Sequence, residues 1–346
     1  MNKVLVTGNL GYIGSVLTDI LVEKGYEVSG YDIGYFQETN FIENKYKIHQ
    51  KIKDIRDIEI QDVYGYDFII HLAAISNDPL GELSPGVTEE INYDSTIKLA
   101  KFAKEAGVKR FVYASSQSLY GIANSKLGLD EDKSEKNPIT AYAKTKWYSE
   151  LELKKLNDKN FTIIIYRPST VFGASPRIRC DIVFNNFLAN AYTTKKIIIK
   201  SNGQPYRPAI HIQDVCHAFL SGIKAPIELV ANEAFNVGFK EGNYSVLELA
   251  NFAKKIVIDS EIEIKNETGN DERTYIVSFD KILNRLKNFY IPKWNLENGG
   301  QEIINFFNNV NFSLKHLDSW QTNRLKQIKR LQNLKKIDNN LRINEI

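Results

Sequence analysis

The sequence predicts an α/β fold, in which a doubly wound parallel β-sheet is joined to a smaller C-terminal lobe. In the first half of the chain, short apolar runs alternate with segments of helical periodicity, as in a sheet wound with right-handed crossovers. The apolar runs contain few polar residues, which is typical of strands covered on both faces. After Pro168 the segments become shorter and more irregular, with glycines and prolines between them, which indicates the second lobe.

The same patterns place the individual elements. Strands are expected at 4–7, 27–32, 67–72, 110–115 and 161–167, and helices near 14–24, 88–106, 141–156 and 244–258. Residues 1–173, with about 206–236, are expected to form the first domain, and residues 174–205 and 237–346 the smaller lobe. In the tail, residues 321–346 carry leucine and isoleucine at helical spacing, with seven basic residues against two acidic ones. We interpret this tail as a packed terminal helix with a solvated face; a helix lying on a membrane surface is the alternative.

Composition excludes several classes of protein. The 346 residues are 43% hydrophobic and 25% charged, as in ordinary globular proteins, and the net charge of +3 is too small to indicate nucleic-acid binding. No apolar stretch approaches the roughly 18 residues of a membrane span, and we recognise no signal peptide. Cys180 and Cys216 show neither zinc-ligand spacing nor a disulfide pattern, so we expect two buried thiols, no metal site and a reducing cytoplasm.

A glycine-rich turn follows the first strand and opens the first helix. Its glycines are Gly8, Gly11 and Gly14, separated by Asn9, Leu10, Tyr12 and Ile13. In this context Gly8 permits a tight turn, Gly11 lets a pyrophosphate approach the backbone at the helix N-terminus, and Gly14 allows close packing of helix on strand. A plain strand–turn–helix would also use glycines, but the spacing predicts a Rossmann-type dinucleotide site.

The ends of the next strands extend that site. Asp32 lies 18 residues after Gly14, where a carboxylate accepts the ribose hydroxyls and repels a 2′-phosphate. No arginine stands next to Asp32 in the sequence, so NAD is favoured over NADP. Asp54 and Ile55 lie where an adenine amine needs an acceptor, and the small residues of 72–74 (Leu72, Ala73 and Ala74) let a cofactor pass close to the backbone. His71 is interpreted as a hydrogen-bonded core histidine.

A second group of candidate residues follows the strand expected at 110–115. Ser115 and Ser116 end that strand, and ligands of doubly wound sheets bind outside the carboxyl ends of strands. Tyr142 and Lys146 are four residues apart on a predicted helix and therefore share one face. A phenol with a pKa near 10 must lose roughly 3 units to act as a base near neutral pH, and a neighbouring ammonium provides part of that stabilisation.

These motifs together resemble the extended short-chain dehydrogenases/reductases, specifically the nucleotide-sugar epimerase/dehydratase group. Asn92 and the run 167–173 extend the resemblance over most of the chain. It implies NAD as cofactor, with Asn92 at the cofactor site. It also implies Tyr142 as the base that takes a sugar hydroxyl proton, Lys146 as the group that lowers its pKa and binds the nicotinamide ribose, and Ser116 as a hydrogen-bond partner of the reacting oxygen. The sugar carbon, most often C4, then gives hydride to the nicotinamide.

Two sequence positions distinguish the different reactions that members of this family catalyse. Sugar 4,6-dehydratases carry an Asp-Glu pair directly after the serine or threonine, whereas this chain has Gln117 and Ser118. The resemblance therefore favours an epimerase that oxidises and re-reduces the sugar. A net nucleotide-sugar 4-dehydrogenase or a ketoreductase is the alternative, a 4,6-dehydratase is disfavoured, and a non-catalytic NAD-binding protein is disfavoured most because Tyr142 and Lys146 are both present.

The resemblance also implies a substrate end in the second lobe. Gln117, Asn185, Arg207 and Arg273 are expected to contact a nucleotide-diphosphate sugar, since arginines bind phosphates bidentately. For Arg177 and Arg179, a phosphate contact and a surface ion pair remain equal alternatives. His211 and Asp214 are expected to fix the start of the following helix. Family members are often dimers, here through the helices predicted at 88–106 and 141–156.

Overall fold

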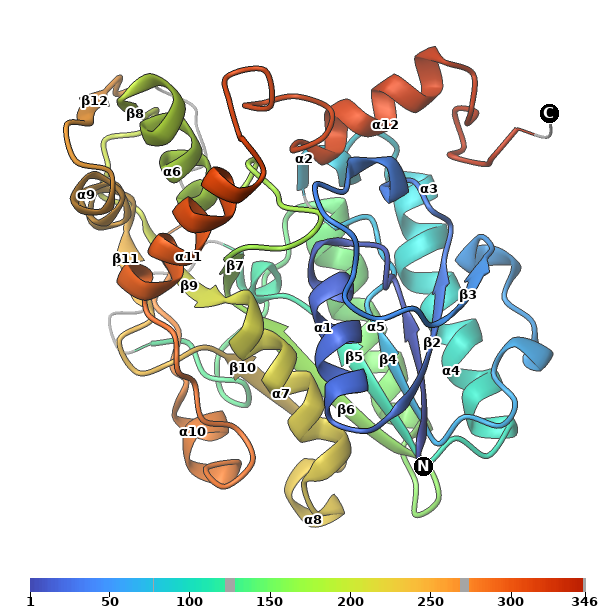
Figure 1. The fold of residues 1–346 in the computed structure, drawn as a ribbon. Coiled ribbons are helices and arrows are strands. Elements are labelled where there is room, and N and C mark those ends of the chain that lie inside the picture. Colours follow the sequence, from blue (N-terminus) through green and yellow to red (C-terminus); the bar gives the residue numbers. More distant parts are fainter. Residues whose placement is uncertain (77, 122–127, 268–273, 345–346) are drawn as a thin grey trace.

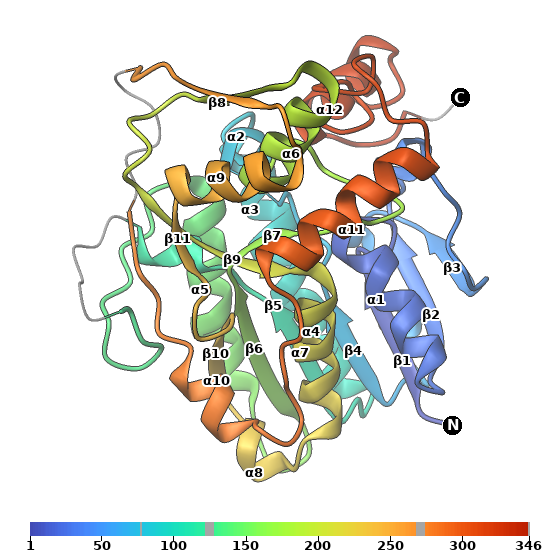
Figure 2. The same cartoon turned by 60° about the vertical axis from the view of Figure 1, so that its left-hand side comes forward.

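A seven-stranded parallel sheet lies at the centre of the molecule, with helices on both faces (Figures 1 and 2). The computed structural model describes residues 1–76, 78–121, 128–267 and 274–344. The strand order is β10-β6-β5-β4-β1-β2-β3. The chain winds outward from β1 through β2 and β3, then returns to β4 beside β1 and winds the other way. Ligands bind where such a sheet reverses its winding, here between the carboxyl ends of β1 and β4.

The strands confirm the predicted α/β fold. Their bounds are β1 Lys3–Thr7, β2 Glu27–Asp32, β3 His49–Ile52, β4 Phe68–His71, β5 Arg110–Ala114, β6 Thr162–Pro168 and β10 Glu233–Val237. Strand β10 was not predicted. Successive residues of a strand enter different cores: Val4 and Val6 pack with α1 and α7, whereas Leu5 packs on the opposite face with α4 and α5. This explains why the strand sequences are apolar throughout.

The covering helices form two layers. On one face α1 (Tyr12–Glu23) packs against α7 (Ile212–Lys224), and on the other α4 (Ser95–Glu105) packs against α5 (Ala141–Leu156). The helix predicted at 88–106 is divided into α3 (Pro85–Glu89), a π-helical turn (Glu90–Asp94) and α4. Short helices α2 (Asp78–Gly81) and α8 (Ile227–Val230) and the 3-10 turns Gln37–Thr39, Ile55–Asp57, Ile60–Asp62 and Gln117–Tyr120 connect the main elements.

The smaller lobe lies beyond the carboxyl ends of the strands. It contains a three-stranded sheet of β7 (Thr170–Phe172), β9 (Tyr206–His211) and β11 (Asn243–Ser245), and a parallel pair of β8 (Lys196–Ile199) and β12 (Glu261–Ile264). Its helices are α6 (Val183–Thr194), α9 (Val246–Ile256) and α11 (Leu296–Asn309), whereas α10 (Asp280–Arg285) packs on β10 of the large sheet. Helix α9 confirms the helix predicted at 244–258, and a capping box between Ser245 and Glu248 fixes its start.

The predicted C-terminal helix is present as α12 (Arg324–Asn333). It lies over the β2–β3 side of the first domain, above the carboxyl ends of the strands (Figure 1). The Gln327 amide donates to the Tyr35 carbonyl of the first domain at 2.9 Å, and the Arg324 guanidinium donates to the Arg177 carbonyl at 2.8 Å, so the tail contacts both predicted domains. The domain boundaries stay predictions. Within the described ranges, no helix is long and apolar enough to cross a membrane.

Candidate active site

A cavity of about 610 Å³ lies at the carboxyl ends of β1, β2, β4 and β5. Most of the predicted site residues line it, although they come from distant parts of the sequence. The lining includes Gly8, Gly11, Tyr12, Ile13, Gly14, Asp32, Asp54, Ile55, Leu72, Ala73, Ala74, Ser116, Gln117, Tyr142, Lys146 and Arg207. Arg273 lies outside the residues that the structure describes. The cavity thus joins the predicted cofactor end to the predicted catalytic end.

The glycine turn has the close backbone packing that a dinucleotide cradle requires. Gly8 has a positive φ of 75°, and a Cβ there would come within 2.6 Å of the Ala73 nitrogen. A Cβ on Gly14 would lie 2.2 Å from the Gly8 carbonyl oxygen. Because side chains are excluded at both positions, the open backbone at the start of α1 faces the cavity. The turn therefore fits a bound pyrophosphate.

Two backbone amides hold the carboxylate of Asp32 in place. Its carboxylate accepts from the Leu10 amide at 3.1 Å and the Gly34 amide at 2.8 Å. Leu10 is not among the cavity-lining residues, so its role in the described structure is to position Asp32. Burial raises the pKa of Asp32, against the lowering effect of the two amides and of Arg177 and Arg324. The tertiary structure thus brings two arginines near Asp32 that its sequence neighbourhood does not contain.

The expected adenosine end carries its own ion pairs. Asp54 lines the cavity, but its carboxylate also accepts from the Arg56 guanidinium, with Oδ2 2.6 Å from Nη2. Tyr31, Tyr35 and Phe36 line the same end of the cavity as Ile55. These aromatic side chains were not predicted from the sequence, because no spacing rule relates them to the glycine turn.

Helix α5 places the catalytic pair. Thr140 caps its start by accepting from the Ala143 amide, so the first turn carries Tyr142 into the cavity. Lys146, one turn later, donates to the Ala114 carbonyl at the end of β5, at 2.7 Å. One further turn along, Glu150 pairs with Arg167 on β6 at 2.6 Å, with both side chains buried. This pair anchors the helix on the sheet and so fixes the height of Tyr142 above it.

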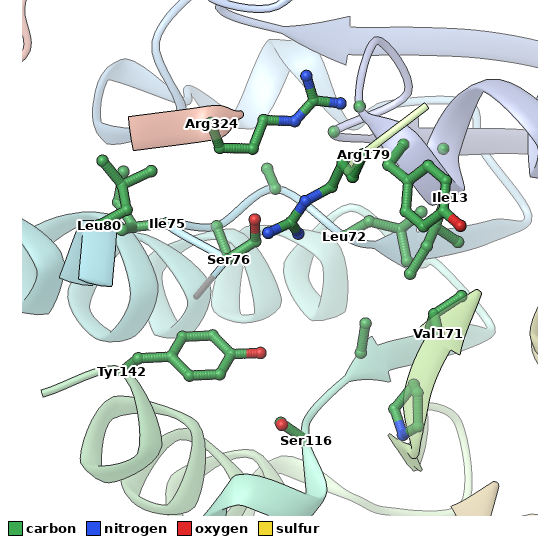
Figure 3. A pocket seen from close by; sticks show the side chains of 18 of the residues that line it. Ile13, Leu72, Ile75, Ser76, Leu80, Ser116, Tyr142, Val171, Arg179 and Arg324 are labelled. Carbon is green, nitrogen blue, oxygen red and sulfur yellow. The ribbon is translucent and has the colours of Figure 1, made fainter. Parts of the chain in front are cut away.

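The hydroxyls of Tyr142 and Ser116 point toward each other on one side of the pocket (Figure 3). Ser116 lowers the pKa of the phenol, and its hydroxyl accepts from the Ser118 amide at 3.1 Å and the Ser118 hydroxyl at 2.9 Å. The Nζ of Lys146 lies 5.9 Å from the centroid of the Tyr142 ring. The predicted triad of serine, tyrosine and lysine is therefore assembled at one place.

Burial dominates the charge state of this triad. Burial raises the pKa of Tyr142 to about 12, in spite of the Ser116 hydrogen bond and the positive charge of Arg179. Burial likewise lowers the pKa of Lys146 to about 7, although the carboxylate of Glu150 acts in the opposite direction. Desolvation therefore dominates the pKa of Tyr142 in the protein without its ligands, and the lowering of that pKa by Lys146 stays a prediction.

Gln117 occupies the position of the first dehydratase acid. Its amide nitrogen donates to the Arg167 carbonyl at 3.0 Å and the Ser169 hydroxyl at 3.1 Å. These acceptors set the orientation of the amide, and its Oε1 has no hydrogen-bond partner within the described residues. Gln117 lines the cavity, and this oxygen is buried beside it.

Asn92 and Asn185, which were predicted to contact cofactor and substrate, both make buried hydrogen bonds within the protein. Asn92 accepts from the Ile75 amide at 2.7 Å and donates to the Ile75 carbonyl at 3.0 Å, so it holds the loop after β4 and does not line the cavity. Asn185 is fully buried; it donates to the Tyr12 hydroxyl at 3.1 Å and accepts from the Gly173 amide at 3.2 Å. Both amides are thus engaged in internal hydrogen bonds, and the contacts of Asn92 to cofactor and of Asn185 to substrate stay predictions.

Arg177 and Arg179, for which a phosphate contact and a surface ion pair were equal alternatives, differ in their position relative to the cavity. Arg179 lines the cavity and points into it (Figure 3), with its guanidinium held 2.8 Å from the Asp181 carboxylate. Arg177 does not line the cavity. Asp78, Tyr275 and Arg324 line it as well, and they were missed because only the tertiary fold brings their segments to this place.

His71 and His211, which were expected to be structural, are both buried and hydrogen-bonded. His71 is buried between the hydroxyls of Thr7 and Thr96, at 2.6 and 2.8 Å, and burial lowers its pKa to about 3. His211 caps α7 by accepting from the Gln213 amide, and Asp214 accepts from the Lys293 and Trp294 amides. Cys180 and Cys216 are free and buried, as predicted.

Comparison with known proteins identifies the family. The model of the NAD dependent epimerase/dehydratase family matches residues 4–238, and the chain belongs to that family. It is 28% identical to UDP-glucose 4-epimerase from Lactobacillus helveticus, over 81% of this chain and 89% of that protein. It is also 28% identical to dTDP-D-glucose 4,6-dehydratase from Mus musculus, over 78% of this chain and 77% of that protein. A solved UDP-glucose 4-epimerase with UDP-glucose, from Thermotoga maritima, superposes with a TM-score of 0.79 at 25% identity, covering 89% of this chain and 99% of that one.

Proposed function

We propose that the protein is an NAD-dependent nucleotide-sugar epimerase, which oxidises the sugar at C4 to a keto intermediate and then reduces it again. One observation carries the proposal: Ser116, Tyr142 and Lys146 meet in the cavity that the glycine turn also lines. A relative and a solved structure named as UDP-glucose 4-epimerases, each matched over more than four fifths of this chain, support it.

Different residues of the chain bind the cofactor, transfer the proton and stabilise the reacting oxygen. The glycine turn and Asp32 would hold NAD, which supplies hydride transfer when bound. Tyr142 takes the proton of the C4 hydroxyl in the oxidation and returns it in the reduction. Ser116 donates a hydrogen bond to the same oxygen, and Lys146 stabilises the phenolate.

The raised phenol pKa makes the cofactor's charge part of this mechanism. The oxidised nicotinamide ring carries one positive charge, so bound NAD adds a second cation beside that of Lys146. The charge of the nicotinamide would thus lower the pKa of Tyr142 from its value of about 12 toward the neutral range. We therefore expect Tyr142 to become a competent base only in the holoenzyme, which protects the empty site from unproductive ionisation.

A 4,6-dehydratase is the second candidate, because a relative carries that name. Its elimination step needs an acid beside the sugar. Neither Gln117 nor Ser118 is an acid, and Gln117 is fixed by three acceptors in the core. Asp78 lines the cavity, but its carboxylate accepts a hydrogen bond from the Thr140 hydroxyl at the start of α5. The epimerase reaction requires no further acid and is therefore favoured.

A substrate panel tests the proposal. Purified protein is incubated with UDP-, GDP-, CDP- and dTDP-hexoses, and the products are followed by NMR and by absorbance at the NADH band. An epimerase inverts C4 with no net NADH. Accumulating NADH would favour the 4-dehydrogenase alternative, and a 4-keto-6-deoxy product would favour the dehydratase.

The assembly and location of the protein are also proposals. Tyr148 and Leu151 on α5 are 50% and 40% exposed, which supports a homodimer that pairs α4 and α5 of two copies. Light scattering of the native protein, compared with a Tyr148→Asp variant, tests it; a monomeric native protein would contradict it. Two buried free thiols support a cytoplasmic location, which cell fractionation would check.

A further inference from the structure

Arg324, the first residue of α12, is a buried cation without an anionic partner in the described part of the chain. Its side chain is 2% exposed. The guanidinium donates to the Thr39 hydroxyl at 3.2 Å and the Arg177 carbonyl at 2.8 Å, and it stacks on the Phe36 ring at 4.4 Å. Both acceptors are neutral, and no ion pair among the described residues includes Arg324.

The surroundings of Arg324 are rich in positive charge. Arg177 and Arg179 are buried beside it and, together with desolvation, lower its pKa to about 9. Asp181 acts in the opposite direction, but its carboxylate is already bound by the Arg179 guanidinium. A buried charge costs several kcal/mol unless an opposite charge compensates it. The fold therefore retains a cation here whose compensation has to come from a ligand.

Arg324 lies where such a ligand would be found. It lines the same cavity as the glycine turn, together with its neighbours Asn323 and Leu325. Figure 3 shows its guanidinium reaching over the pocket from the start of α12, on the same side as Arg179. Its charge also acts on Asp32, so it lies toward the adenosine end of the cavity.

We propose that Arg324 is a counter-ion of the NAD diphosphate, and that the C-terminal segment 323–344 is thereby part of the cofactor site. The inference rests on the cofactor position in the proposed function. A nucleotide sugar also carries a diphosphate, but contacts to Phe36 and Thr39 place Arg324 beside the cofactor's half of the cavity.

The segment is anchored independently of any ligand. Gln327 donates to the Tyr35 carbonyl at 2.9 Å, and Arg56 donates to the Asn340 carbonyl at 2.8 Å. Arg342 pairs with Asp57 at 2.6 Å. These contacts join α12 and the residues after it to the loops that follow β2 and β3. Arg324 is therefore held in place before the cofactor arrives, which lowers the entropic cost of the contact.

Binding measurements on full-length Arg324→Gln test the proposal, with Arg330→Gln as the control. Arg330 is on the same helix, pairs with Glu38 and stacks on Trp320, but does not line the cavity. The two variants therefore lose the same charge. Calorimetric titrations with NAD, ADP, adenosine and UDP are compared in cofactor-free protein. We expect Arg324→Gln to raise the Kd for NAD and ADP by about tenfold or more, with little change for adenosine and UDP, and Arg330→Gln to leave all four unchanged.

Other outcomes of these titrations would contradict the proposal or the function on which it rests. Unchanged NAD and ADP affinity in Arg324→Gln overturns the proposal, as does an equal loss in Arg330→Gln. A loss confined to UDP moves the contact to the substrate diphosphate and refutes the cofactor assignment. Native protein that binds no NAD refutes the proposed function itself. Should Arg324→Gln not fold, hydrogen exchange of native α12 decides: ADP should slow it at least severalfold, and unchanged exchange counts against the proposal.

Discussion

Replacing Lys146 with methionine should shift the pH at which the enzyme becomes active. Tyr142 has a pKa of about 12 in the protein without ligands, and the Nζ of Lys146 lies 5.9 Å from its ring centroid. A unit charge about 6 Å away is worth about 3 kcal/mol at an effective dielectric constant of about 20. This corresponds to roughly 2 pKa units of the phenol, so the acidic limb of the profile should move upward by that amount.

The assay is the pH dependence of kcat/KM at saturating NAD, with the nucleotide sugar that turns over in the panel. At pH 7 the loss should be about 100-fold, and it should shrink as the pH rises and the phenol ionises without help. Lys146 and Tyr142 titrate as a coupled pair, so the profile reports the macroscopic pKa values of the pair.

Lys144→Met is the matched control, because Lys144 is exposed on the same helix and carries the same charge. It should leave the profile unchanged. A loss in Lys146→Met that is equal at every pH would show that Lys146 only positions groups. Wild-type activity in that variant would refute the electrostatic role altogether.

Three further changes test the rest of the site. Tyr142→Phe should lower kcat at least about 100-fold while NAD affinity in calorimetry stays nearly unchanged, and retained turnover would exclude Tyr142 as the base. Asp32→Ala should weaken NAD more than NADP, because it removes the ribose acceptor and the negative charge that repels a 2′-phosphate; an unchanged preference in parallel titrations would contradict this. Gly14→Ala should abolish NAD binding and lower the Tm, since its Cβ would meet the Gly8 carbonyl at 2.2 Å, whereas the control Gly86→Ala has open space; equal melting curves and affinities would disprove the cradle.

Local sequence patterns were sufficient for the fold and for much of the site. Strand and helix periods are properties of neighbouring residues, so the parallel sheet and helix α5 could be predicted closely. The glycine turn and the Tyr142/Lys146 spacing are local too, because each lies within one turn or one helix. The resemblance of these motifs to an NAD-dependent family was confirmed by the family match.

Only the tertiary structure decided which polar residues face the cavity. The positions of Asn92 and Asn185 in the sequence suggested contacts to ligands, yet both side chains make buried hydrogen bonds to the backbone. Desolvation is equally non-local: it raises the phenol pKa of Tyr142, where helical spacing alone suggested a lowered one.

The sequence by itself determined the sheet, the glycine cradle and the catalytic pair, since each depends on the chemistry of residues close together in the chain. The tertiary structure decided the charge around the cofactor. Arg324 lies 292 positions after Asp32, and its charge nevertheless acts on that carboxylate. Long-range packing of α12 creates this pairing, and no spacing rule in the sequence encodes it.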